Sequence, residues 1–183
     1  MKAKYIQVLP INRSNHFGVA CMKIRLVILD GDGVLWDHQD LSALFLPFRL
    51  IKRDTIVDAN GEKVRLLKGV RKLLRVLGKR EIIITLATWN KPEHVTQALQ
   101  LFKVNEYFRV VEAHFHPDKH LMIKNILKKL MNEGVMLEPN QILYVDDRTV
   151  HIADVRKEIG DVHFLQMHVD VKHSLEILKY IGN

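Results

Sequence analysis

One short stretch, residues 27–36, constrains this chain more than any other. A strand-length apolar run ends there in two carboxylates, Asp30 and Asp32, with a glycine between them. Such a run predicts a buried strand of an open α/β sheet, and these folds bind ligands at the carboxyl ends of their strands. Two aspartates at that edge indicate a divalent metal ion and phosphate chemistry. A plain surface turn is the alternative, since Asp-Gly pairs mark turns. A calcium loop is not favoured, because its fifth position needs an oxygen ligand and holds Val34 here.

Length and composition predict a single domain. With 183 residues, of which 48% are hydrophobic, the chain can bury one substantial core. Residues 22–183 are expected to form this domain, and residues 1–21 an N-terminal extension whose role the sequence leaves open. The single cysteine, Cys21, cannot form an internal disulfide, which predicts a reducing, cytoplasmic location. No apolar run approaches transmembrane length, so no membrane partner is expected.

The formal charge of +7 is dispersed along the chain. Basic residues such as Arg71, Arg75 and Lys128 fall mostly at the polar positions of predicted amphipathic helices, where a solvated surface explains them. Nucleic-acid binding is expected to show clustered charge with interleaved aromatic residues, and neither is found. We therefore expect no nucleic-acid partner.

Strands and helices alternate along the chain. Buried strands are predicted at about residues 24–29, 82–87, 109–112, 142–145 and 162–167. Helices are predicted over about residues 70–77, from about 92, over about 121–130, from about 150, and with an end near 181. A β-hairpin is predicted at 55–66, with Asn60 and Gly61 in its turn. This order implies an α/β three-layer sandwich around a central, mainly parallel sheet.

Reactive polar side chains stand at the ends of the predicted strands, and one more, Lys119, opens a predicted helix. In a parallel sheet these ends share one edge, so carboxylates, a hydroxyl and an ammonium group are expected to meet in one crevice. Each is weak evidence alone, because such residues also cap helices and form turns. Together they make a much stronger signal: Asp30, Asp32, Thr88, Lys119, Asp146 and Asp147.

This set resembles the motifs of the haloacid dehalogenase superfamily of phosphotransferases. The first motif of that superfamily corresponds to Asp30 through Val34, the second to Thr88, the third to Lys119 and the fourth to the Asp146-Asp147 pair. The resemblance covers residues 24 to about 180 and implies a haloacid-dehalogenase-like Rossmannoid core. Only about fifty residues separate the first two motifs, which leaves room for one small β-hairpin insertion and no large cap domain.

Within the superfamily, the chain is most similar to the magnesium-dependent phosphatases. The features that carry this similarity are Leu35-Trp36, Pro47-Phe48, the hairpin at Gly61, Gly69 and Asp154. We expect Asp154 to be a structural helix residue and not a metal ligand.

The resemblance implies a role for each motif residue. Asp30 is the expected nucleophile and Asp32 the general acid and base. Thr88 and Lys119 are expected to bind the phosphoryl group, together with Trp89 and Asn90, which follow Thr88. A Mg²⁺ cofactor is expected to be held by Asp30, the Asp32 backbone carbonyl and Asp147, with Asp146 as a ligand through water or an orienting neighbour.

The implied substrates are phosphorylated small molecules or phosphoproteins, bound at an open site. Phosphotyrosine-like, protein-attached and sugar phosphates are the expected classes.

Two features depart from the superfamily pattern and leave the substrate in question. Gly31 replaces a commonly apolar residue, and Trp89-Asn90 replaces a commonly polar pair. Three alternatives also stay open: a module that binds phosphorylated ligands without turnover, another hydrolase of the superfamily such as a dehalogenase, and a zinc site. The zinc site would use three histidines near Lys119, namely His114, His116 and His120.

Overall fold

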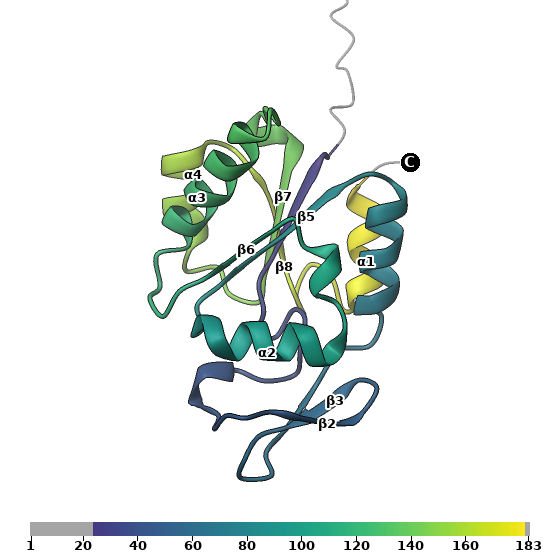
Figure 1. The fold of residues 1–183 in the computed structure, drawn as a ribbon. Coiled ribbons are helices and arrows are strands. Elements are labelled where there is room, and N and C mark those ends of the chain that lie inside the picture. Colours follow the sequence, from purple (N-terminus) through teal and green to yellow (C-terminus); the bar gives the residue numbers. More distant parts are fainter. Residues whose placement is uncertain (1–23, 182–183) are drawn as a thin grey trace, which may run out of the picture.

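The computed structural model describes residues 24–181, which fold around a five-stranded parallel sheet (Figure 1). The strand order is β6-β5-β1-β7-β8. The strands are β1 (Leu26–Leu29), β5 (Ile83–Thr88), β6 (Val110–Ala113), β7 (Ile142–Asp146) and β8 (His163–Gln166). The sequence predicted all five within one or two residues. The predicted extension over residues 1–21 lies outside the described residues.

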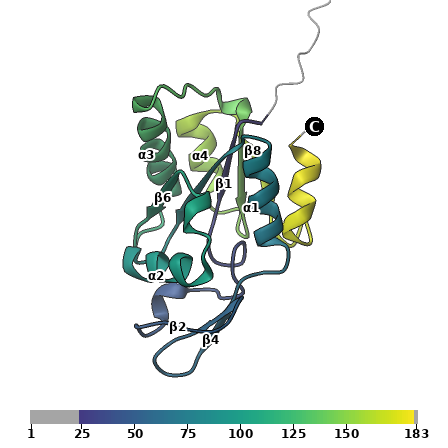
Figure 2. The ribbon, with the colours of Figure 1, turned by 45° about the vertical axis from the view of Figure 1, so that its right-hand side comes forward.

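Helices cover both faces of this sheet. Helices α3 (Lys119–Asn132) and α4 (Ile152–Ile159) lie on one face. The opposite face is covered by α1 (Val70–Lys79) and η4 (Ser174–Tyr180), which lie side by side in Figure 2. Both faces of β1 are therefore buried, which is why its sequence is continuously apolar.

In two helices the spacing of the buried residues matches the type of helix that forms. Helix α1 buries Val70, Leu73, Leu74 and Leu77, the spacing of one α-helical face. The last predicted helix is a 3₁₀ helix, η4. It buries Ser174 and Ile177, three residues apart, which matches three residues per turn.

Helix α2 (Pro92–Phe102) lies beyond the carboxyl ends of the strands, with a small antiparallel sheet on its far side (Figure 1). Three further 3₁₀ turns connect the larger elements: η1 (Leu41–Ala43), η2 (Asn105–Tyr107) and η3 (Pro139–Gln141). No helix between residues 24 and 181 has the length and apolar character needed to cross a membrane.

The small sheet is larger than the predicted hairpin. The hairpin itself is confirmed as β3 (Thr55–Val57) and β4 (Lys63–Arg65), which pair in antiparallel register. A third strand, β2 (Arg49–Lys52), pairs with β3. The sequence did not indicate β2, because all four of its residues are exposed and no alternation of apolar and polar residues marks it.

Candidate active site

The predicted motif residues converge at the carboxyl edge of the parallel sheet. Asp30 directly follows β1, Thr88 ends β5, Asp146 ends β7 and Lys119 begins α3. All four side chains are buried, with exposed fractions of 0–1%. The structure therefore brings these four groups together at one edge of the sheet, where they are shielded from solvent.

Lys119 ties the two acidic strand ends together. Its Nζ atom donates to Asp30 Oδ1 at 2.6 Å and to the Ala87 carbonyl oxygen at 2.6 Å. The same nitrogen lies 3.4 Å from Asp146 Oδ2. A buried ammonium group is stable only with such partners, so this lysine compensates the charge of both carboxylates.

The two compensated carboxylates differ in acidity. Burial raises the pKa of Asp30, and Lys119 only partly opposes this effect. Burial alone would also raise the pKa of Asp146. The charge of Lys119 and hydrogen bonds from the Tyr144 hydroxyl and the Arg148 backbone N–H instead hold that pKa below its ordinary value. Asp146 is therefore the more firmly ionised of the two.

Three carboxylates lie close enough to share a metal ion. Oxygen atoms of Asp30, Asp146 and Asp147 all lie within 4.8 Å of one another. Asp147 Oδ1 is buried and accepts no hydrogen bond, and the pKa of this residue is raised by burial and by the charge of Asp146. A hard divalent cation would satisfy this oxygen and relieve the repulsion, so the residues fit Mg²⁺.

Gly33 makes room for the third carboxylate. Its φ angle of +67° favours glycine, and a Cβ atom there would lie 2.9 Å from Asp147 Oδ2. The first-motif glycine at this position therefore allows Asp147 to approach the end of β1.

Asp32 is held through both of its carboxylate oxygens. The Trp36 indole Nε1 donates to Oδ1 at 2.6 Å, and Asn90 Nδ2 donates to Oδ2 at 2.8 Å. Burial raises the pKa of Asp32, while these two hydrogen bonds lower it. The carboxylate is thus fixed in orientation, and its affinity for a proton is enhanced. It does not belong to the group of three carboxylates described above.

Asn90 connects the Asp32 carboxylate to Thr88 and Ser42 through hydrogen bonds. Its side chain is fully buried and also donates to Thr88 Oγ1 at 3.0 Å, while its Oδ1 accepts from the Ser42 backbone N–H and hydroxyl. The sequence predicted Asn90 as a substrate-binding residue, whereas the structure engages its amide entirely with Asp32, Thr88 and Ser42.

The other departure from the superfamily pattern, Gly31, has a steric cause. A Cβ atom at this position would lie 2.6 Å from the Trp36 ring and 2.8 Å from Thr88 Oγ1. The indole that holds Asp32 therefore leaves room only for glycine.

Trp89 stands at the mouth of the site. A cavity of about 170 Å³ opens there, lined by Asp32, Gln39, Asp40, Trp89, Phe115 and Arg148. The two aromatic side chains are exposed, Trp89 by 36% and Phe115 by 62%. The Arg148 guanidinium lies 5.9 Å from the Trp89 ring, and Lys91 Nζ lies 5.3 Å from the Phe115 ring. The rim therefore combines aromatic surface with positive charge.

The neighbouring histidines form other contacts. His114 Nε2 lies 2.7 Å from Glu112 Oε2, and His116 Nδ1 lies 3.4 Å from Asp118 Oδ2. Within residues 24–181, the aspartates are the only group of three or more potential ligands placed to share a metal. Asp154 is exposed in the first turn of α4, outside that group.

Comparison with solved structures identifies the same fold. The N-terminal part of a Bacteroides fragilis protein, described as containing a phosphatase domain complexed with Mg, aligns with a TM-score of 0.58 and 18% identity over 88% of this chain. This chain spans only 41% of that one. A HAD-superfamily hydrolase from Geobacter sulfurreducens aligns with a TM-score of 0.58 and 20% identity, over 86% of this chain and 99% of that one.

A third structure, 3-deoxy-D-manno-octulosonate 8-phosphate phosphatase from Yersinia pestis, aligns with a TM-score of 0.50 and 20% identity, over 86% of this chain and 70% of that one. At these identities the likeness shows the fold. Comparison with curated protein sequences gave no match.

These structures show the fold, and a family model shows the family to which the chain belongs. The model described as acid phosphatase matches residues 23–170, most of the chain and every motif residue named above. The protein belongs to the acid phosphatase family and has the haloacid dehalogenase fold.

Proposed function

We propose that this protein hydrolyses phosphate monoesters through a phosphorylated Asp30, with Mg²⁺ as its cofactor. The observation that carries the proposal is the buried contact of Asp30 with Lys119, at 2.6 Å, beside two further carboxylates. A carboxylate nucleophile repels a phosphate dianion unless cations neutralise the phosphoryl oxygens. Lys119 supplies one such charge.

The residues divide the reaction into two halves. An Asp30 oxygen attacks phosphorus, the ester P–O bond breaks, and Asp32 gives its proton to the leaving oxygen. Asp32 then takes a proton from water, which attacks the same phosphorus and breaks its bond to Asp30, releasing inorganic phosphate. The raised pKa of Asp32 suits the proton donor, and the hydrogen bonds from Trp36 and Asn90 hold the carboxylate in place for both halves.

Thr88 and the metal complete the phosphoryl site. The Thr88 hydroxyl accepts from Asn90, which leaves its own proton free to donate to a phosphoryl oxygen. Asp30, Asp146 and Asp147 would hold Mg²⁺ together with the Asp32 backbone carbonyl. When bound, the ion neutralises charge on the phosphoryl oxygens. The Bacteroides fragilis structure, described as complexed with Mg, supports this choice.

The rim favours aryl phosphates and phosphotyrosine-like groups on larger molecules. The cavity of about 170 Å³ beside Asp32 is small, so a substrate whose phosphoryl group reaches Asp30 would place the rest of its structure against the exposed rings of Trp89 and Phe115. Arg148, whose guanidinium lies near the Trp89 ring, adds positive charge beside that surface. An open rim of this kind would accept a substrate attached to a protein.

Substitution of the nucleophile tests the mechanism. Asp30→Asn should abolish Mg²⁺-dependent hydrolysis of p-nitrophenyl phosphate, because an amide cannot form the acyl-phosphate. Asp154→Asn, in the exposed first turn of α4, is the matched control and should keep full activity. Near wild-type turnover by Asp30→Asn would refute the nucleophile. A wild-type protein that binds phosphate with Mg²⁺ but never turns over would indicate the binding module instead.

Matched substrates test the specificity. We expect phosphotyrosine within a peptide to be hydrolysed at least as well as free phosphotyrosine. Trp89→Ala and Phe115→Ala should raise KM for aryl phosphates more than KM for an alkyl phosphate of similar size. A preference for the smallest phosphates, with peptides unreactive, would contradict the open-rim proposal.

A further inference from the structure

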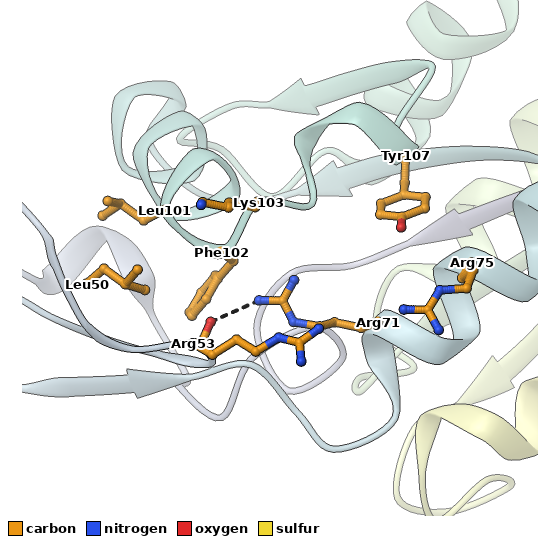
Figure 3. A pocket seen from close by; sticks show the side chains of 8 residues that line it. All are labelled: Leu50, Arg53, Arg71, Arg75, Leu101, Phe102, Lys103 and Tyr107. Atoms are coloured by element: carbon orange, nitrogen blue, oxygen red, sulfur yellow. Dashed lines mark hydrogen bonds between the residues drawn. The ribbon is translucent and has the colours of Figure 1, made fainter.

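A basic cavity lies at the opposite end of α2 from the active site. Helix α2 begins after Asn90, beside Asp32, and its 11 residues make it about 16 Å long. At its far end, α2, α1, η2 and the turn after β2 enclose a cavity of about 460 Å³. Four cationic side chains line the cavity, namely Arg53, Arg71, Arg75 and Lys103 (Figure 3).

The arginines face a common space. Figure 3 shows the guanidinium groups of Arg53 and Arg71 close together, Arg75 reaching toward them from α1, and the Tyr107 hydroxyl pointing into the same region. Three arginines from two elements, α1 and the turn after β2, thus present planar hydrogen-bond donors to one cavity. The paired N–H groups of a guanidinium have a spacing that matches two oxygen atoms of one phosphate group.

The positive charge of this cavity is only partly compensated. Arg71 donates to Asp54 Oδ1 at 2.5 Å and to the Arg53 carbonyl oxygen at 2.9 Å. Within residues 24–181, the side chains of Arg53, Arg75 and Lys103 form no hydrogen bond or ion pair. Four cations therefore share one carboxylate, and the like charges repel unless an anion joins them.

The remaining walls strengthen the attraction for an anion. Leu50, Leu101 and the buried ring of Phe102 replace water on one side of the cavity, which weakens dielectric screening. The chain's own first 23 residues contain no Asp or Glu, so they do not supply the missing negative charge.

We propose that this cavity is a second ligand site, which binds a small polyanion carrying at least two phosphoryl groups. Four cationic side chains with one carboxylate partner leave an excess of positive charge that a single phosphate neutralises only in part, whereas two linked phosphoryl groups carry enough negative charge to balance it. The volume of about 460 Å³ lies in the usual range for small-molecule sites. The concave shape and the convergence of four cationic side chains on one cavity favour a small molecule over a nucleic-acid duplex or a membrane surface.

Binding of inorganic pyrophosphate tests the site. Titration calorimetry on the full chain in Mg²⁺-free buffer measures affinity, while tryptophan emission reports on the active site, because both tryptophans of the chain, Trp36 and Trp89, lie there. We expect one pyrophosphate per chain and no change in emission. The double variant Arg53→Ala/Arg75→Ala should bind at least about tenfold more weakly, since charged hydrogen bonds are lost. Both side chains lack partners within residues 24–181, so this variant should fold normally.

A matched double variant separates the cavity from the overall charge. Arg49→Ala/Lys72→Ala removes the same charge from exposed positions of β2 and α1 outside the cavity, and it should keep its affinity within about twofold. If both double variants lose the same affinity for pyrophosphate, the overall positive charge of the protein attracts the ligand, and the proposal is overturned. Binding that survives Arg53→Ala/Arg75→Ala and changes tryptophan emission would place the ligand in the active site. Sulfate binding as tightly as pyrophosphate would also overturn the proposal.

Discussion

The Trp36 indole and the Asp32 carboxylate are joined by a hydrogen bond of 2.6 Å, and both side chains are buried. Trp36 is a fully buried member of the larger hydrophobic cluster, which also contains the buried residues of α1 and Ile177 of η4. The general acid proposed here is therefore aligned by a core residue. Catalysis and packing are linked through one side chain.

Removal of this hydrogen bond should slow catalysis more than it weakens binding. Trp36→Phe keeps an aromatic ring in the core but leaves Asp32 Oδ1 without its donor. We expect kcat to fall at least about tenfold with little change in KM, since a hydrogen bond to a charged group contributes about 1.5–3 kcal/mol. Phe48→Leu, in the same cluster, is the control and should lower stability without this fall in kcat. Equal kcat values in the two variants would mean that Trp36 acts through packing alone.

Lys119 and Lys128 lie on the same helix in opposite environments. Lys119→Met removes the buried charge that faces Asp30 and should lower kcat by at least about 100-fold. It should also lower the free energy of unfolding, because Asp30 and Asp146 lose their compensating charge. Lys128 is exposed, and Lys128→Met should change neither quantity. Kinetics on the folded fraction, verified by circular dichroism, would test this, and similar kcat losses in both variants would contradict it.

Mg²⁺ should raise the melting temperature of the protein as well as activate it. A ligand that binds only the folded state stabilises that state, and the three clustered carboxylates repel one another without a cation. Asp147→Asn should abolish most of the Mg²⁺-dependent shift, whereas Asp154→Asn should keep it. Ca²⁺ should bind but inhibit, because its larger shell misaligns the nucleophile. Activation by Zn²⁺ alone would contradict the aspartate site and would support the alternative zinc site at His114, His116 and His120.

A buried carboxylate outside the proposed active site, Glu112, predicts that the fold is sensitive to acid. Burial alone would raise the pKa of Glu112, but Lys129 at 2.5 Å and His114 at 2.7 Å hold it below its ordinary value of 4.5. These contacts therefore stabilise the fold fully above about pH 4.5, and the stabilisation is lost as the pH falls through the folded-state pKa.

Lys129→Met should accordingly lower the free energy of unfolding by about 1 kcal/mol at pH 7 and by much less at pH 3. Urea denaturation of this variant and of Lys128→Met at both values would test the prediction. A loss that is equal at the two pH values would show that Lys129 acts through packing.

The strand ends were predictable because each strand is a short apolar run that stops at a polar residue. In β5, residues IITLAT end at Thr88, and parallel pairing then brings this end to the edge where β1 and β7 also stop. The positions of Asp30, Thr88, Lys119 and Asp146 relative to the predicted strands were therefore sufficient to predict that these residues lie close together. Their convergence follows from sheet geometry and did not require knowledge of side-chain contacts.

Contacts between side chains carry no such periodic signal. Asp32 is held by Trp36, four positions away in the turn after β1, and by Asn90, 58 positions away, and no helix or strand periodicity marks either contact. The cavity proposed to bind a polyanion likewise combines residues between Arg53 and Tyr107. Arg71 and Arg75 were predicted to lie on a solvated helix face, and Arg75 is exposed there. That they also line a cavity was not predictable from the helix pattern, because η2 and the turn after β2 form its other walls.

Strand β2 also has a consequence for solubility. It forms an outer strand of the small sheet and exposes two large apolar side chains, Leu50 and Ile51. Outer strands can recruit a strand from another molecule and so begin aggregation. Here a basic residue stands at each end of β2, Arg49 and Lys52, and its pairing with β3 shifts register between Leu50 and Lys52. Two such molecules meeting edge to edge would bring like charges together along an irregular ladder, so this edge resists intermolecular pairing.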